Sequence, residues 1–167
     1  SSGHLILVPV VTGWPDQGLL IDTAVHVGTL GAVLVYFWRD LAGLLSGLGR
    51  GLRGRGDAAF RLLGLLVLAS LPVIVVGGVL ALSGWQGALR DTQVVAWATL
   101  VFGVVLLVAD RLFLTVRRLE HMKVSGALLI GVAQVLALIP GTSRAGITMT
   151  AARMLGFERR DAARFSM

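Results

Sequence analysis

The sequence has no cysteine and few charged residues. No cysteine occurs in its 167 residues, which excludes disulfides and metal sites built on thiolates. Charged residues make up only 14% of the chain, whereas soluble domains are about a quarter charged. Hydrophobic residues reach 56%, and the mean hydropathy is +0.84. This composition indicates an integral membrane protein with a single domain.

Acidic residues are scarcer than basic ones, so the chain carries a net charge of +6. Such a charge can indicate binding to nucleic acid. Here, however, the basic residues lie in short segments between apolar runs, as in the cytoplasmic loops of membrane proteins. We therefore exclude nucleic acid as a partner and expect contact with membrane lipids.

Three apolar runs are long enough to span a bilayer, which takes about 20 mostly apolar residues. They cover residues 19–38, 62–82 and 94–114. Arginine dominates residues 39–61, which we interpret as a flexible, glycine-rich cytoplasmic loop, and basic residues also dominate residues 115–124. The sequence therefore predicts an all-α, polytopic helical bundle.

The pattern changes after Lys123. An apolar run of about 16 residues, short for a span, leads into the stretch IPGTSRAGITMT, and basic residues follow. We predict a re-entrant helix hairpin over residues 125–157, broken at Pro140 and Gly141. SSGH at the start of the chain is weakly similar to TSRAG, which favours an inverted repeat.

The predicted break combines groups that suit a phosphate or diphosphate. A helix that restarts near Ala145 aims free backbone N–H groups at the break, and the planar guanidinium of Arg144 matches phosphate oxygens. Glycine lets a ligand approach the backbone, and hydroxyls donate hydrogen bonds. The alternative is that Thr142 or Ser143 only caps the helix, while Arg144 reaches the membrane interface. The candidate residues are Gly141, Thr142, Ser143, Arg144, Gly146 and Thr148.

SSGH is the second candidate site. Ser1 or Ser2 could be a nucleophile, with His4 as its base or as a general acid. The sequence contains no GxxxxGK[ST], HExxH or GxSxG motif. Only SSGH and TSRAG therefore carry recognisable chemistry.

Two other groups of ionisable residues lie within the predicted spans. His26 follows Asp22 by four residues, and either a functional or a hydrogen-bonded packing role fits it. Asp110 and Arg111 lie near the inner end of the third span, where we expect them to form an interfacial ion pair.

At SSGH and TSRAG the chain resembles the undecaprenyl-diphosphate phosphatase family, also called the bacitracin-resistance (BacA) family. PGTSRAGIT matches the family motif PGxSRSGxT except at Ala145, where serine is usual. SSGHLIL matches the end of the motif PVSS[ST]GH. Similarity in DTAVHVGTLGAVLVYFWRDL and GFERRDAARFSM extends the resemblance over essentially the whole chain.

The resemblance implies hydrolysis of undecaprenyl diphosphate to undecaprenyl phosphate and inorganic phosphate, which recycles the lipid carrier for cell-wall synthesis. It also implies an inverted repeat with two re-entrant hairpins, multi-pass in the bacterial inner membrane, with the active site facing the extracytoplasmic side. Arg144 would clamp the diphosphate, and Ser143 and Thr148 would bind phosphate or a metal-bound water.

The same resemblance implies roles for the first residues of the chain. His4 would be the general acid or base, Ser1 matches the serine proposed as nucleophile, and Ser2 matches the residue before the glycine. Whether a serine attacks or His4 activates water stays open.

A divalent cation, Mg²⁺ or Ca²⁺, is implied as the cofactor. The glutamates that precede SSGH in the family are missing from this chain, so its metal ligands are unknown. Both ends of the sequence look cut, and we expect such a fragment to be inactive or nearly so by itself. A homodimer is one candidate for the oligomeric state.

Three other functions compete. A polyprenyl-phosphate flippase would also use Arg144 and hydroxyls, but it has no need of a Ser/His pair. The phosphatidic-acid-phosphatase type 2 superfamily has a PSGH element, but it requires histidine where this chain has Thr150. A non-catalytic scaffold would not depend on Arg144 for binding a prenyl diphosphate.

Overall fold

The structure, a computed structural model, is built from helices. It describes residues 2–15, 18–83, 91–113 and 115–167, with residues 2–4, 6 and 19 described by their backbone alone. The described part contains no β-strand, only one isolated bridge between Arg117 and Phe157. The elements are α1 (Ser2–Thr12), α2 (Gly18–Tyr36), α3 (Trp38–Leu52), α4 (Ala58–Ser83), α5 (Thr92–Leu112), η2 (Leu119–His121), α6 (Val124–Gln134), η3 (Val135–Leu138), α7 (Arg144–Met154) and α8 (Arg159–Ser166).

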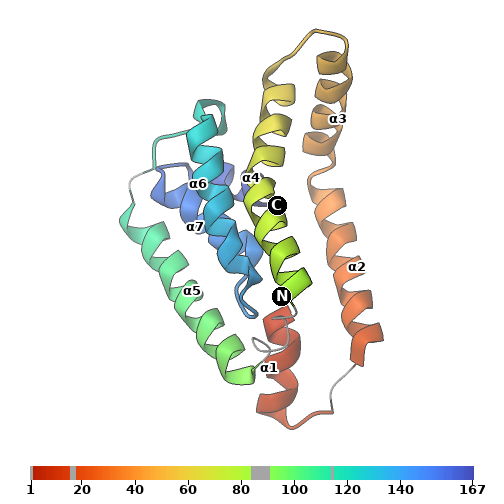
Figure 1. Cartoon of the computed structure of the whole chain (residues 1–167), viewed down its shortest axis with the longest axis vertical. Coiled ribbons are helices and arrows are strands. Elements are labelled where there is room, and N and C mark those ends of the chain that lie inside the picture. The colour runs from red at the N-terminus through yellow and green to blue at the C-terminus, as the bar shows by residue number, and fades with distance from the viewer. Residues whose placement is uncertain (1, 16–17, 84–90, 114) are drawn as a thin grey trace. The chain divides into compact units, whose positions relative to one another are not determined.

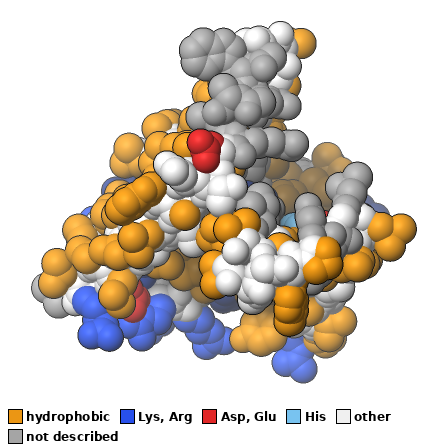
Figure 2. All heavy atoms as spheres, turned by 90° about the horizontal axis from the view of Figure 1, so that it is seen from below, with side chains coloured by type: hydrophobic (Ala, Val, Ile, Leu, Met, Phe, Trp, Pro, Cys, Tyr) orange, Lys and Arg blue, Asp and Glu red, His pale blue; other side chains and the backbone are white. Residues whose placement is uncertain are grey.

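Among the described residues, α4 and α5 are each long and apolar enough to cross a membrane. Helices α2 and α3 meet at a bend of 74° and add a third candidate if the pair counts as one span. Hydrophobic side chains cover much of the surface in Figure 2, which suits contact with lipid. The expectation of an all-α membrane protein is confirmed.

The chain forms two compact units. One consists of Pro15–Val67, and the other combines Ser1–Trp14 with Leu68–Met167. Helix α4 contributes its first part to the smaller unit and the rest to the larger one.

In the smaller unit, helix α3 replaces most of the loop predicted over residues 39–61, so that prediction is wrong. Its glycines form a close helix contact. A Cβ on Gly47 would lie 2.6 Å from the Cβ of Ala59, and a Cβ on Gly51 would overlap the ring of Phe60. Small residues let two helix backbones approach this closely, so these glycines indicate packing of α3 on the start of α4.

Asp57 organises the connection between α3 and α4. Its Oδ1 accepts the backbone N–H of Phe60 at 3.0 Å, which caps the start of α4. Its Oδ2 accepts a hydrogen bond from Arg50 Nε at 2.8 Å. The Phe60 N–H, followed by the Arg50 guanidinium, holds the pKa of Asp57 below its ordinary value of 3.8.

We predict that acid opens this connection. Because the pKa of Asp57 is lowered by folding, its contribution to stability is complete above the unfolded pKa and is lost as the pH falls through the folded pKa. Protection of the Phe60 amide against hydrogen exchange, corrected for intrinsic exchange rates, should therefore fall below pH 3.8. Asp57→Asn should show the loss at neutral pH, and equal protection in the two proteins at pH 7 would contradict this role.

In the larger unit, the hairpin of α6, η3 and α7 lies between α5 and the second part of α4 (Figure 1). Helix α7 packs on α5, α6 and α8. Helix α6 approaches α4 so closely at Gly131 that a Cβ there would overlap the backbone of Ala69. Ala127 and Ile130 on the same helix are fully buried. The hairpin is thus held on both sides.

Candidate functional site

The predicted break lies between η3 and α7. Ile139 is extended, with ψ at 121°, as a residue before proline tends to be. Gly141 takes the left-handed region with φ at +94°, which glycine adopts without strain. The N–H of Thr142 donates to the carbonyl of Ile139 at 3.1 Å, which closes a turn around Pro140. The helix–break–helix arrangement is therefore present, and its depth in a membrane stays a prediction.

Helix α5 holds the break in place. A Cβ on Gly141 would lie 2.8 Å from the Cα of Val95, which is buried. The hydroxyl of Thr99 lies 3.0 Å from the carbonyl of Gly141 and 2.8 Å from that of Val95, so its hydrogen is shared between the two. Gly141 was predicted as a point of ligand approach. In the structure, its missing side chain makes room for the α5 backbone.

Ser143 caps the helix that follows the break. Its Oγ accepts the N–H of Gly146 at 3.2 Å, which satisfies one of the free N–H groups in the first turn of α7. The hydrogen of this exposed hydroxyl stays available for donation. The capping alternative from the sequence is therefore correct for Ser143, and it leaves room for contact with a ligand.

Arg144, the first residue of α7, is exposed. Its guanidinium makes no hydrogen bond or ion pair with any residue that the structure describes. A cation at a helix N-terminus is opposed by the positive end of the helix dipole. An anion bound at the break would compensate the charge of Arg144 and the positive end of the helix dipole. The start of α7 is therefore suited to binding an anion.

The two threonines of the stretch differ in their hydrogen bonds. Thr142 Oγ1 is buried and has no hydrogen-bond partner among the described residues, whereas a buried hydroxyl normally has one. Thr148 is buried, and its hydroxyl donates to the carbonyl of Arg144 at 2.9 Å. A contact of Thr148 with phosphate would require that hydroxyl to change partner, whereas a contact of Thr142 would require its buried hydroxyl to become accessible.

The SSGH residues belong to the beginning of α1. Ser1 lies outside the described residues, and the side chains of Ser2 and His4 lie outside them too. Helix α1 packs on α5, the same helix that holds the break. In Figure 1, α1 starts at about the height of the hairpin tip and runs downward from there. The catalytic roles of these three residues stay predictions.

Asp110, near the end of α5, binds arginines at the C-terminal end of α7 and at the start of α8. Arg159 donates to its carboxylate through Nε at 2.8 Å and Nη2 at 2.6 Å. The buried Arg153 donates from Nη2 to the Asp110 carbonyl at 2.9 Å. Its Nε lies 3.2 Å from Oδ1 but is not aligned as a hydrogen bond. The predicted pair of Asp110 with Arg111 is wrong, because consecutive residues on a helix do not face each other.

His26 has a local role in α2. Its Nδ1 lies 2.6 Å from the backbone carbonyl of Asp22, so the ring N–H donates to that oxygen. The bond stays within one turn of one helix. Of the two roles open from the sequence, it favours the hydrogen-bonded one.

The described residues do not form a site for a divalent cation. Mg²⁺ and Ca²⁺ prefer oxygen ligands and are usually held by carboxylates. No group of three His, Cys, Asp or Glu within the described ranges could hold a metal ion, and the break supplies hydroxyls and carbonyls but no carboxylate. No reaction step is therefore derived through a cation, and Mg²⁺ or Ca²⁺ stays a prediction.

Comparison with known proteins decides the family. The family model described as bacitracin resistance protein BacA matches residues 1–167. The chain belongs to the BacA family. It is 50% identical to undecaprenyl-diphosphatase 1 of Rhodospirillum rubrum, and 49% and 51% identical to the undecaprenyl-diphosphatases of Ruegeria pomeroyi and Dinoroseobacter shibae. The matches cover the whole chain and 61%, 63% and 63% of these relatives, so the chain spans less than two thirds of their length.

We predict that Gly141→Ala destabilises the packing of the break on α5. The new Cβ would meet the Val95 backbone in a left-handed conformation, which should cost more than about 1 kcal/mol. Thermal unfolding in detergent, followed by circular dichroism, should show a lower midpoint. The control is Gly103→Ala on α5, where a Cβ meets open space. A midpoint equal to that of the control would contradict the close approach.

We also predict that Asp110→Asn loosens α7 and α8. The change leaves the buried Arg153 without its carboxylate, and removing one partner of a buried charge is destabilising. Hydrogen exchange of the α8 amides should become faster than in the original chain. Glu120→Gln, which removes an exposed carboxylate from η2, is the matched control. Unchanged hydrogen exchange of the α8 amides in Asp110→Asn would show that the Asp110 carboxylate is not needed to hold α7 and α8.

Proposed function

We propose that the protein to which this chain belongs hydrolyses undecaprenyl diphosphate to undecaprenyl phosphate and inorganic phosphate. Two lines support the proposal. The chain belongs to the BacA family, and its relatives are named undecaprenyl-diphosphatases. Within the chain, the observation that carries the proposal is Arg144, an exposed and unpaired cation at the start of α7 among the residues that the structure describes.

A diphosphate suits this position by charge and by geometry. The guanidinium of Arg144 can take two phosphate oxygens at once. The first turn of α7 adds backbone N–H groups, and Ser143 adds a hydroxyl hydrogen. The hydroxyl of Thr142, which is buried and has no partner among the described residues, would supply one more donor once the break admits the ligand. A prenyl tail would extend along the apolar surface into lipid.

In the proposed reaction, a water oxygen bonds to the terminal phosphorus, and the bond from that phosphorus to the bridging oxygen breaks. Undecaprenyl phosphate leaves with the bridging oxygen, and the transferred phosphoryl group is released as inorganic phosphate. His4 takes the proton of the attacking water or protonates the leaving oxygen. In the second route, Ser1 attacks first, and water then releases phosphate from the serine. In both routes, Arg144 stabilises the charge on the phosphoryl oxygens.

We further propose that the break faces the extracytoplasmic side of the bacterial inner membrane. The basic residues 115–124 come before α6, and the basic start of α8 comes after α7, so both outer ends of the hairpin carry positive charge. Positive loops favour the cytoplasmic side. The break then lies toward the opposite side, where lipid carriers of cell-wall synthesis are recycled. Nothing in the described residues favours a flippase over a phosphatase.

The proposal is tested by phosphate release from undecaprenyl diphosphate in detergent, with the complete protein. Arg144→Ala should lower kcat/KM by roughly 100- to 1,000-fold, the usual loss when one donor to a developing oxyanion is removed. Arg144→Lys should retain part of the activity, because it keeps the charge and loses the planar fork. Arg160→Ala, which removes an exposed cation from α8, is the control. Full activity in Arg144→Ala, or an equal loss in the control, would reject the proposed site.

A further inference from the structure

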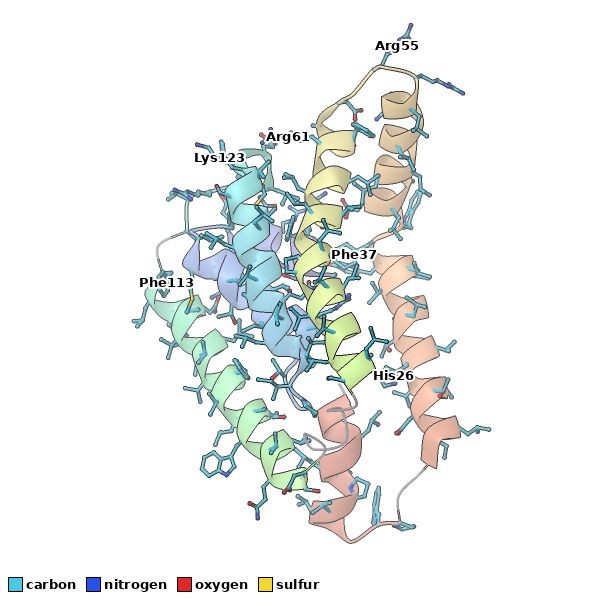
Figure 3. All side chains as sticks on the ribbon, viewed as in Figure 1. His26, Phe37, Arg55, Arg61, Phe113 and Lys123 are labelled. Carbon is cyan, nitrogen blue, oxygen red and sulfur yellow. The ribbon has the colours of Figure 1, made fainter. Side chains whose placement is uncertain are left out.

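A cavity of about 440 Å³ lies at the start of α6, away from the break. Figure 3 shows Lys123 at this end of the helix. The separation follows from chain geometry, because the residues of α6 and η3 between the two places extend over roughly 20 Å. The polar side chains of the lining are Arg117, His121, Lys123 and Ser125. None of the lining residues within the described part of the chain is acidic.

The two cations of this cavity leave most of their hydrogen-bonding capacity unused. Lys123 is exposed, and its ammonium makes no hydrogen bond or ion pair with any described residue. Arg117 donates one Nη1 hydrogen to the carbonyl of Leu155 at 3.1 Å, which orients the guanidinium and leaves its other hydrogens available. Two positive side chains without a carboxylate between them favour an anion.

His121 contributes a donor whose tautomer follows from its hydrogen bond. Its Nδ1 lies 3.1 Å from the backbone nitrogen of Arg118. A backbone N–H can only donate, so Nδ1 accepts and the ring hydrogen of the neutral imidazole lies on Nε2. That Nε2–H can donate to a ligand. The ring is therefore held by Nδ1, and its Nε2 has no hydrogen-bond partner among the residues that the structure describes.

The first turn of α6 adds further donors. Its cap residue, Lys123, makes no side-chain cap, so the first N–H groups of the helix are not satisfied by that side chain. Ser125 stands in this turn with an exposed hydroxyl. Together with the cations, these groups surround the cavity with donors that match the oxygens of a phosphate group.

An apolar stripe leaves the cavity along α6 and η3. Leu129 lines the cavity and is exposed, and Val132 and Leu136 continue from it at helical spacing, also exposed. A free phosphate ion would make no use of such a stripe. An acyl chain would lie along it while its headgroup occupies the cavity.

We infer that this cavity binds the phosphate group of an anionic phospholipid. Basic pockets on the cytoplasmic side of membrane helices are suited to such headgroups, and the charge of residues 115–124 places this end of α6 on that side. The cavity is separate from the break, so the protein carries a lipid site in addition to its proposed catalytic one. The inference does not depend on the proposed hydrolysis.

Native mass spectrometry of the full chain, released from detergent, measures how much lipid the protein retains. The protein is titrated with phosphatidylglycerol or with phosphatidylcholine of the same acyl chains. Phosphatidylglycerol should be retained in preference. Lys123→Gln should weaken its binding about tenfold, as expected for the loss of one charged hydrogen bond. Arg160→Gln, which removes an equal charge outside the cavity, should bind as the original chain does.

Three results would overturn the inference: equal retention of the two lipids, equal weakening by Arg160→Gln, or displacement of phosphatidylglycerol by inorganic phosphate at the same concentration. The last result would assign the cavity to a free anion. Circular dichroism melting checks that Lys123→Gln folds. If it does not fold, Ser125→Ala serves in its place, since it removes a single exposed hydroxyl, and it should weaken phosphatidylglycerol binding without affecting phosphatidylcholine.

Discussion

A break between two apolar helices leaves backbone groups that lipid cannot satisfy, so a neighbouring part of the protein has to contact them. In this chain, α5 meets that requirement. The backbone at Val95 lies against Gly141, and the hydroxyl of Thr99 bonds the Gly141 carbonyl. Only glycine allows both the left-handed turn and this close approach. The position of the break, and of everything that follows it in α7, depends on this contact.

Helix α5 holds α7 at both ends, and the two attachments differ in character. At the break, the contact is mostly backbone on backbone and leaves Ser143 and Arg144 exposed. At the other end, the carboxylate of Asp110 pairs with both Arg153 and Arg159. The paired arginines are structural, whereas Arg144, which has no partner among the described residues, is available for a ligand. This difference in pairing separates the arginine of the proposed site from Arg153 on the same helix and from Arg159 on α8.

Much of this architecture could be predicted from the sequence. Long apolar runs indicated α4 and α5, and Pro140 with Gly141 indicated the break, because each acts through local chain chemistry. Long-range contacts could not be predicted. The glycines of α3 led to the prediction of a loop, because their packing on Ala59 and Phe60 depends on a neighbouring helix. The partners of Asp110 lie more than forty residues away, and Thr99 had no sequence signal beyond its place in an apolar helix. The charge of Asp110 near the end of an apolar span was a signal that something pairs with it.

The central claim is that the start of α7 binds a diphosphate. The most direct measurement is hydrogen exchange of the complete protein with and without a prenyl methylenediphosphonate, whose bridging carbon blocks hydrolysis. The amides from Arg144 to Gly146 should become protected when the analogue binds, and Arg144→Ala should abolish this protection. Saturating binding with no change in these amides would place the diphosphate elsewhere and would contradict the account.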